Sequence, residues 1–199
     1  RAQYAGYRQE SGVDPESTTP TYAAVKLQID NWRWQGVPFY LRSGKNLKEK
    51  LSQVTIQFKE PPHLLFPTKD GRLTPNMLVL FLQPDEGIHW RFEAKAPDTV
   101  SDLRSVDMEF HYADAFGKTA IPESYERLLL DALTGDASLF TRADEVETAW
   151  GLMDPILDAW ESNGQPLPVY EPGSWGPAEA DDLLARDERQ WNTWDGRVE

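Results

Sequence analysis

The hydrophobic pattern of this chain changes its period once, near residue 120, and that change constrains the fold more than any other feature. Before that point, apolar and polar residues alternate with a period of two, which is the pattern of strands with one buried face. Beyond it, apolar residues recur at the spacing of an amphipathic helix. A block of strands followed by a block of helices is typical of an α+β domain.

Six segments of the first block predict strands, because they alternate or are rich in β-forming residues and end at turn residues. They are residues 21–29, 38–42, 54–59, 77–83, 89–95 and 106–112. The later segments are separated by Pro84-Asp85-Glu86-Gly87 and by Ala96-Pro97-Asp98, and these residue types favour tight turns. Parallel neighbours need long crossovers, so such short connections predict an antiparallel meander.

Three segments of the second block predict helices, namely residues 122–133, 143–161 and 178–186. The first has Pro122 at its start, where the missing N–H does no harm, and Gly135 just beyond its end. Pro155 is expected to kink or divide the second helix. Residues 1–21 are predicted to be an irregular lead-in, and residues 163–178 a loop rich in Pro and Gly.

Length and composition narrow the class of protein. The 199 residues suit one domain with a sizeable core, so residues 1–199 are expected to form a single unit. A net charge of -13 argues against nucleic-acid and membrane-surface partners. Both kinds of partner carry phosphate groups, which bind proteins through Lys and Arg side chains and are repelled by an acidic protein. The chain has no Cys, which excludes disulfides and Cys nucleophiles and suits the cytoplasm. It starts without Met, so we expect it to be part of a longer protein.

One basic stretch stands out in this acidic chain. Residues 42–50 carry the cationic side chains of Arg42, Lys45, Lys48 and Lys50. Arg42, Lys45 and Lys50 can converge on one anion such as a phosphate monoester, for which charge-assisted hydrogen bonds are strong. An exposed, solvated loop explains the same residues, and spacing alone does not decide between the two interpretations.

Other candidate residues carry weaker signals. Gln83 ends a predicted strand and offers an amide donor and acceptor to a sugar hydroxyl, or it simply closes a turn. His63, His89 and His111 fall in separate segments without metal-ligand spacing, so no metal site is predicted and strand-packing or surface positions are favoured. No Gly-rich phosphate loop lies between a strand and a helix, which argues against a dinucleotide-binding fold. The acidic helix residues and the Trp residues are better explained by solvated faces and core packing.

Short motifs spread along the chain add an independent clue. They are residues 17–24 (STTPTYAA), 30–45 (DNWRWQGVPFYLRSGK), 83–88 (QPDEGI), 125–132 (YERLLLDA), 139–146 (LFTRADEV) and 173–177 (GSWGP). With these motifs in this order, the chain resembles the C-terminal domain of glucose-6-phosphate dehydrogenase over nearly its whole length.

This resemblance implies a large, mostly antiparallel sheet with helices packed on it, and a homodimer or homotetramer formed through that sheet. It implies hydride transfer from C1 of glucose 6-phosphate to NADP or NAD, which gives 6-phosphogluconolactone, the entry step of the pentose phosphate pathway. Lys45 and Lys50 match residues that contact the sugar phosphate in this family. Gln83 matches a glutamine that touches the same substrate.

The family's coenzyme-binding domain and catalytic histidine have no counterpart in these residues. No catalytic residue is therefore assigned, NADP is expected to bind mainly outside the chain, and the chain alone is expected to be inactive. Leu51, Phe81 and Trp175 stand where eukaryotic members place Lys or Arg around a second, structural NADP. These replacements argue against that second site and for a bacterial-type member.

Two hypotheses follow from the sequence. The first is part of a dehydrogenase in which Lys45, Lys50 and Gln83 form one wall of a sugar-phosphate site. The alternative is a non-catalytic regulatory or oligomerisation module that uses the face of its sheet, as the apolar strands and abundant Trp suggest.

Overall fold

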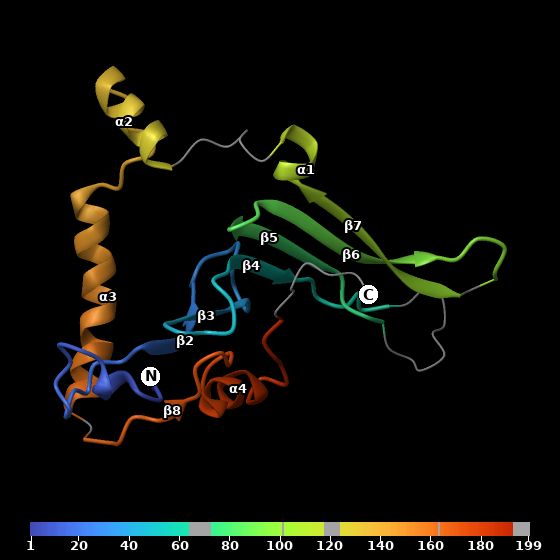
Figure 1. Cartoon of the computed structure of the whole chain (residues 1–199). Helices are drawn as coiled ribbons and strands as arrows, with labels where there is room; N and C mark the ends of the chain where they lie inside the picture. The colour runs from blue at the N-terminus through green and yellow to red at the C-terminus, as the bar shows by residue number, and fades with distance from the viewer. Residues whose placement is uncertain (64–72, 101, 118–123, 163, 193–199) are drawn as a thin grey trace. The chain divides into compact units, whose positions relative to one another are not determined.

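The computed structural model describes residues 1–63, 73–100, 102–117, 124–162 and 164–192 (Figure 1). The chain divides into two compact units. The first combines residues 1–48 with 122–191, and the second combines residues 49–121 with 192–199. Mostly antiparallel strands together with helices confirm the predicted α+β class.

A long antiparallel hairpin frames the first unit. Its strands are β2 (Tyr22–Gln28) and β3 (Pro38–Gly44), which pair along their full lengths. A parallel pair joins β1 (Gln3–Tyr4) to β8 (Val169–Tyr170), and so links distant parts of the sequence. Patterning missed this pair because strands of 2 residues are too short to show a period.

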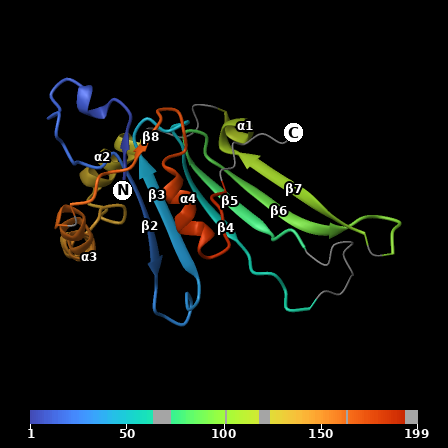
Figure 2. The same cartoon turned by 90° about the horizontal axis from the view of Figure 1, so that it is seen from below.

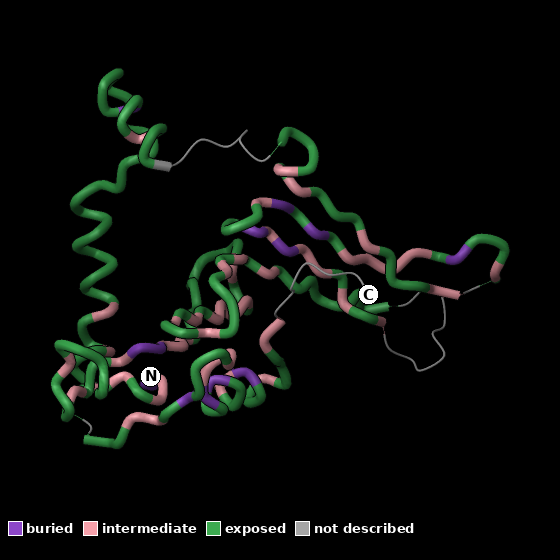
Figure 3. Tube along the Cα trace, in the orientation of Figure 1, coloured by how far each residue is buried: buried purple, intermediate pink, exposed green. Residues whose placement is uncertain are grey.

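The core of the first unit is built around Tyr22, which is 2% exposed. Its buried neighbours are Ala2, Tyr170 and Ala180, and in Figure 3 the buried residues gather near the N-terminus, β8 and helix α4 (Ala178–Ala185). The Tyr22 and Tyr170 rings meet edge to face, with centroids 5.5 Å apart. These contacts tie the start of the hairpin to the C-terminal part of the unit.

Residues 1–21, expected to be an irregular lead-in, consist mainly of turns, with β1 and the short 3-10 helix η1 (Tyr7–Gln9) among them. Part of this segment still belongs to the core, because the Gln3 side chain is buried. Its amide donates to the carbonyl oxygens of Ser17 and Thr19 at 2.9 and 2.8 Å. A single buried amide therefore fixes the path of the segment.

The three predicted helices are present as α2 (Ser124–Thr134), α3 (Ala143–Ser162) and α4. Pro155 lies inside α3, which continues past it without division. Many apolar side chains of α2 and α3 are exposed, among them Leu129, Leu133, Trp150 and Leu152. Within the described residues, no helix has both the length and the hydrophobicity needed to cross a membrane.

The second unit is a four-stranded antiparallel sheet in the order β4, β5, β6 and β7 (Figure 2). The strands are β4 (Ser52–Gln57), β5 (Met77–Gln83), β6 (Gly87–Lys95) and β7 (Leu103–His111). The predicted meander is confirmed. The last strand starts earlier than predicted and ends at His111, because Tyr112 opens helix α1 (Tyr112–Phe116).

The two faces of this sheet differ in burial. The cross-strand register groups one set of apolar residues, called here the apolar sheet face: Val54, Ile56, Leu78, Leu80, Leu82, Ile88, Trp90, Phe92, Val106, Met108 and Phe110. Most of its members are exposed; Trp90 is 46% and Met108 61% exposed. The opposite face contains the buried residues Val79, Phe81 and His89. The unit therefore exposes a largely apolar surface, with the exposed Arg104, which pairs with Ala94 on the same side of the sheet, at its edge.

Candidate functional site

Lys45 follows β3 in a turn that depends on a glycine. A Cβ atom added to Gly44 would lie 2.6 Å from the buried Tyr22 ring, which is closer than packing allows. The next residue, Asn46, has a φ of 49°, a left-handed conformation that Asn tolerates better than most residues. The Ser-Gly-Lys-Asn sequence thus turns the chain sharply against the core and leaves the Lys45 side chain exposed.

The Pro- and Gly-rich loop around β8 holds this turn in place. The Tyr170 hydroxyl donates to the Lys45 carbonyl at 2.6 Å, and the Lys45 amide donates to the Thr21 carbonyl at 2.8 Å. Further along, the Gly173 amide donates to the Asn46 carbonyl at 2.9 Å. Because both the amide and the carbonyl of Lys45 are hydrogen-bonded, its backbone is fixed, and its ammonium group projects from a rigid base.

Arg42, expected to share an anion with Lys45, lies among aromatic rings instead. Its guanidinium carbon is 4.5 Å from the ring centroid of Trp191 and 5.2 Å from that of Trp175. Burial lowers the pKa of Arg42 from its ordinary value, and the nearby Tyr22 hydroxyl partly offsets this. The structure therefore gives Arg42 a packing role, with cation–π contacts on indole rings.

Lys50 and Gln83 lie at one end of the four-stranded sheet. Gln83 is the last residue of β5 and pairs with Ser52, the first residue of β4. Lys50 precedes Ser52 by two positions, and both Lys50 and Gln83 are exposed. The β4–β5 register thus brings these two predicted site residues to the same edge of the second unit.

Lys45 belongs to the first unit, whereas Lys50 and Gln83 belong to the second. In the described part of the chain, neither lysine ammonium has an ion-pair partner. Two surface depressions, at the start of α3 and around η1, include none of the three residues in their linings. Lys45 and Lys50 therefore present uncompensated positive charge to solvent, which suits an anionic ligand.

Sequence reasoning missed a polar cluster on the buried face of the sheet. The fully buried His89 has its Nε2 atom 3.0 Å from Oδ1 of Asp107, to which Arg91 Nε also donates at 2.8 Å. The hydrogen bonds from Arg91 hold the pKa of Asp107 below its ordinary value. The favoured strand-packing position is confirmed for His89. The sequence did not reveal Asp107 as the partner of His89, because the two residues become neighbours only through the β6–β7 register.

The three positions at which a structural NADP would need a cation carry no cationic side chain. Phe81 is 6% exposed and stacks on the ring of His111, and Trp175 lies against Arg42. Neither residue, nor Leu51, can supply a cation to a coenzyme phosphate. Among the residues that the structure describes, no group of three or more His, Asp or Glu side chains is arranged to hold a metal ion.

Comparison with known proteins places these features in one family. Residues 1–192 match the family model described as glucose-6-phosphate dehydrogenase, C-terminal domain. Glucose-6-phosphate 1-dehydrogenases of Aggregatibacter actinomycetemcomitans and Chlamydia pneumoniae are 47% and 45% identical to the chain. Each alignment covers 94% of this chain but 37% of the relative, so the chain spans little more than a third of the length of these relatives.

Solved structures agree with the sequence matches. Glucose-6-phosphate 1-dehydrogenase from Mycobacterium avium has a TM-score of 0.81 and 35% identity, with 99% of this chain and 40% of that chain covered. A glucose-6-phosphate dehydrogenase in complex with its substrate glucose-6-phosphate has a TM-score of 0.83 and 31% identity, with 96% and 40% covered. From its sequence and its fold together, the chain belongs to the glucose-6-phosphate dehydrogenase C-terminal domain family.

Proposed function

We propose that residues 1–199 act as the C-terminal domain of a longer cytoplasmic enzyme that oxidises glucose 6-phosphate at C1 to 6-phosphogluconolactone with NADP, the entry step of the pentose phosphate pathway. The observation that carries this proposal is the pair of exposed lysines, Lys45 and Lys50, in a family of glucose-6-phosphate dehydrogenases. The solved relative in complex with glucose-6-phosphate, with a TM-score of 0.83, supports the choice of substrate.

In this proposal the chain binds and orients the substrate. Lys45 and Lys50 donate charge-assisted hydrogen bonds to the phosphate group, and Gln83 bonds a sugar hydroxyl. NADP, when bound, accepts the hydride from C1. The residues that hold NADP and the base that takes the C1 hydroxyl proton lie outside this chain, so the 199 residues alone are expected to be inactive.

The test is kinetic and uses the full-length protein that contains this chain. Replacing Lys45 or Lys50 with Ala removes a charge-assisted contact of about 1.5 to 3 kcal/mol, which lowers kcat/KM for glucose 6-phosphate by about 10- to 100-fold, mainly through KM. Gln83→Ala is expected to have a smaller effect in the same direction. Lys59→Ala, at another exposed lysine, is the matched control and should behave like the wild type. Wild-type KM values in both lysine variants would refute these assignments.

We also propose that the apolar sheet face packs against a second copy of the chain, giving a homodimer or a homotetramer. Exposed apolar surface of this extent marks an interaction site in a folded protein. A purely regulatory or oligomerisation module would use the same face without substrate binding. Binding of glucose 6-phosphate that depends on Lys45 and Lys50 separates the dehydrogenase proposal from that alternative.

A further inference from the structure

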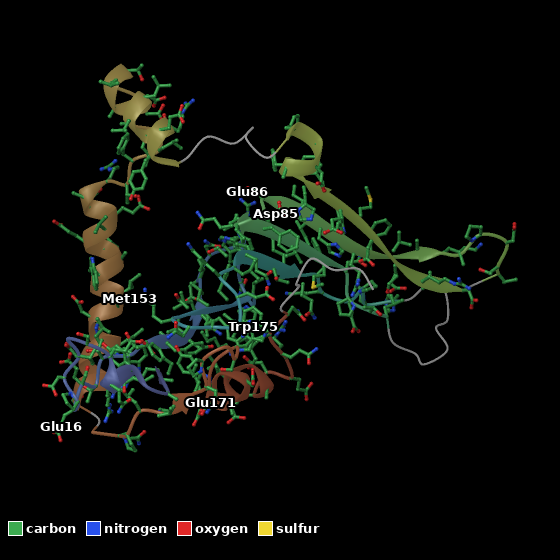
Figure 4. All side chains as sticks on the ribbon, viewed as in Figure 1. Glu16, Asp85, Glu86, Met153, Glu171 and Trp175 are labelled. Carbon is green, nitrogen blue, oxygen red and sulfur yellow. The ribbon has the colours of Figure 1, made fainter. Side chains whose placement is uncertain are left out.

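His111 is the last residue of β7, at the end of the sheet where β5 turns into β6. Figure 4 labels Asp85 and Glu86 in that turn. His111 pairs in register with Gly87, the first residue of β6. Its side chain is only 16% exposed, although the turn of Asp85 and Glu86 beside it faces solvent more openly. The largely buried imidazole of His111 is therefore packed against the turn that directly follows Gln83.

The imidazole contacts the chain on both sides of Gln83. The Phe81 ring, two residues before Gln83, stacks on it with centroids 5.6 Å apart and an angle of 19° between the planes. The Asp85 carboxylate, two residues after Gln83, has Oδ2 3.1 Å from His111 Nδ1. A single ring thus bridges the end of β5 and the turn, and Gln83 lies between its two contacts.

His111 is itself anchored to β7. Its Nε2 atom lies 2.7 Å from Oε1 of Glu109, which shares its strand. The backbone of the turn is also bonded to the residue that follows His111, because the Tyr112 amide donates to the Glu86 carbonyl at 3.0 Å. A Cβ atom at Gly87 would lie 2.5 Å from the Phe110 carbonyl and 2.9 Å from His111 Nδ1, so glycine is what lets the ring approach the turn.

The charge of the ring decides how many of these contacts are favourable. Carboxylates face it from three elements: Asp85 from the turn, Glu109 from β7 and Asp114 from α1. Nε2 is hydrogen-bonded to Glu109, whereas Nδ1 has no hydrogen-bond partner among the described residues and meets the Asp85 carboxylate as an ion pair, which only the imidazolium can form. The hydrogen bond to Glu109 raises the pKa of His111, and burial partly opposes this. The bridged arrangement is therefore the protonated one.

We propose that His111 is a positioning residue for the substrate contact of Gln83, and that its protonated ring clamps the turn after Gln83 onto β7. This inference rests on the proposed function, because that function gives Gln83 its contact with glucose 6-phosphate. Deprotonation removes the positive charge that attracts the Asp85 carboxylate, so the turn loosens. Affinity for the sugar phosphate then falls as the pH rises through the pKa of His111.

The kinetic test compares His111→Gln with His63→Gln in the full-length protein. His63 is an exposed histidine and serves as the matched control. At pH 6.5, His111→Gln is expected to raise KM for glucose 6-phosphate by about three- to tenfold with kcat changed less than about twofold. The ratio of variant to wild-type KM should shrink towards pH 9, where the wild type has lost the clamp as well. A ratio that stays constant with pH would overturn the proposal.

Asp85→Asn provides a second variant that leaves the ring in place. It removes the carboxylate that the clamp holds, so its KM should rise to a similar extent. The double variant His111→Gln with Asp85→Asn should be no worse than either single variant, because the two changes break the same contact. Fully additive effects on KM would contradict a shared clamp.

Hydrogen exchange measures the turn independently of the reaction. In the same full-length protein, the amides of residues 82, 83 and 85–88 should exchange about tenfold faster in His111→Gln than in the wild type at pH 6.5. If exchange is unchanged, the clamp is overturned even where KM rises. If the wild type does not oxidise glucose 6-phosphate, the proposed function fails, and the exchange comparison still decides whether His111 holds the turn.

Discussion

At the scale of single residues, Asp107 joins β6 to β7 through its negative charge. Arg91 donates to both of its oxygens, at 2.8 and 3.3 Å, and this lowers the pKa of Asp107. A carboxyl group whose pKa is lowered by folding stabilises the folded state above its unfolded pKa of about 4, and that stabilisation is lost as the pH falls. Asp107→Asn should therefore lower the free energy of unfolding by about 1 to 2 kcal/mol at pH 7 and by less at pH 3.

Urea denaturation followed by tryptophan fluorescence measures this difference at the two pH values. Asp158→Asn is a suitable control, since Asp158 is exposed on α3. Acid weakens many other carboxylate interactions too, so the quantity to compare is the difference in free energy of unfolding between variant and wild type. A difference that does not become smaller towards pH 3 would show that the interaction of Asp107 with Arg91 does not depend on the charge of Asp107.

At the scale of elements, α3 contains Pro155 at an interior position, where proline is unfavourable. Proline has no N–H to donate to the carbonyl of Gly151 one turn earlier, yet the helix continues from Ala143 to Ser162. Pro155→Ala should therefore restore a hydrogen bond and raise the free energy of unfolding by about 1 to 3 kcal/mol. Asp154→Ala, the neighbouring exposed position, should change stability by only a few tenths. Unfolding midpoints from circular dichroism compare the two, and an unchanged or lower midpoint for Pro155→Ala would count against this explanation.

Local signals were enough to predict most elements but not their contacts. The β4 to β7 meander was predictable because its strands alternate and its turns contain Pro, Asp and Gly. The β1–β8 pair was not, because it joins short segments far apart in the sequence. Lys50 and Gln83 were identified one at a time, but their common edge depends on a register with an irregularity between Ser52 and Gln53. No local pattern reveals such a shift.

At the scale of the whole molecule, charge and hydrophobicity make opposite demands on self-association. A net charge of -13 makes two copies repel each other over long distances. Salt screens this repulsion beyond about 8 Å at physiological ionic strength, whereas contact between apolar surfaces is little affected. The strand residues on this side of the sheet include Arg104 but no carboxylate, so two copies can meet there without bringing carboxylates together.

The sheet-face interface can be tested by placing one charge on it. Met108 is 61% exposed near the middle of β7, so Met108→Lys should leave folding intact but put an unpaired ammonium in the interface. We expect the variant to sediment as a monomer at concentrations where the wild type is dimeric or larger, a loss of about 3 to 5 kcal/mol in association free energy. Val100→Lys is the matched control, because Val100 is 92% exposed and lies in the connection between β6 and β7, outside the apolar sheet face. If Val100→Lys stays associated while Met108→Lys dissociates, the interface lies on the apolar sheet face. Unchanged association in both variants would show that the interface is not on this face.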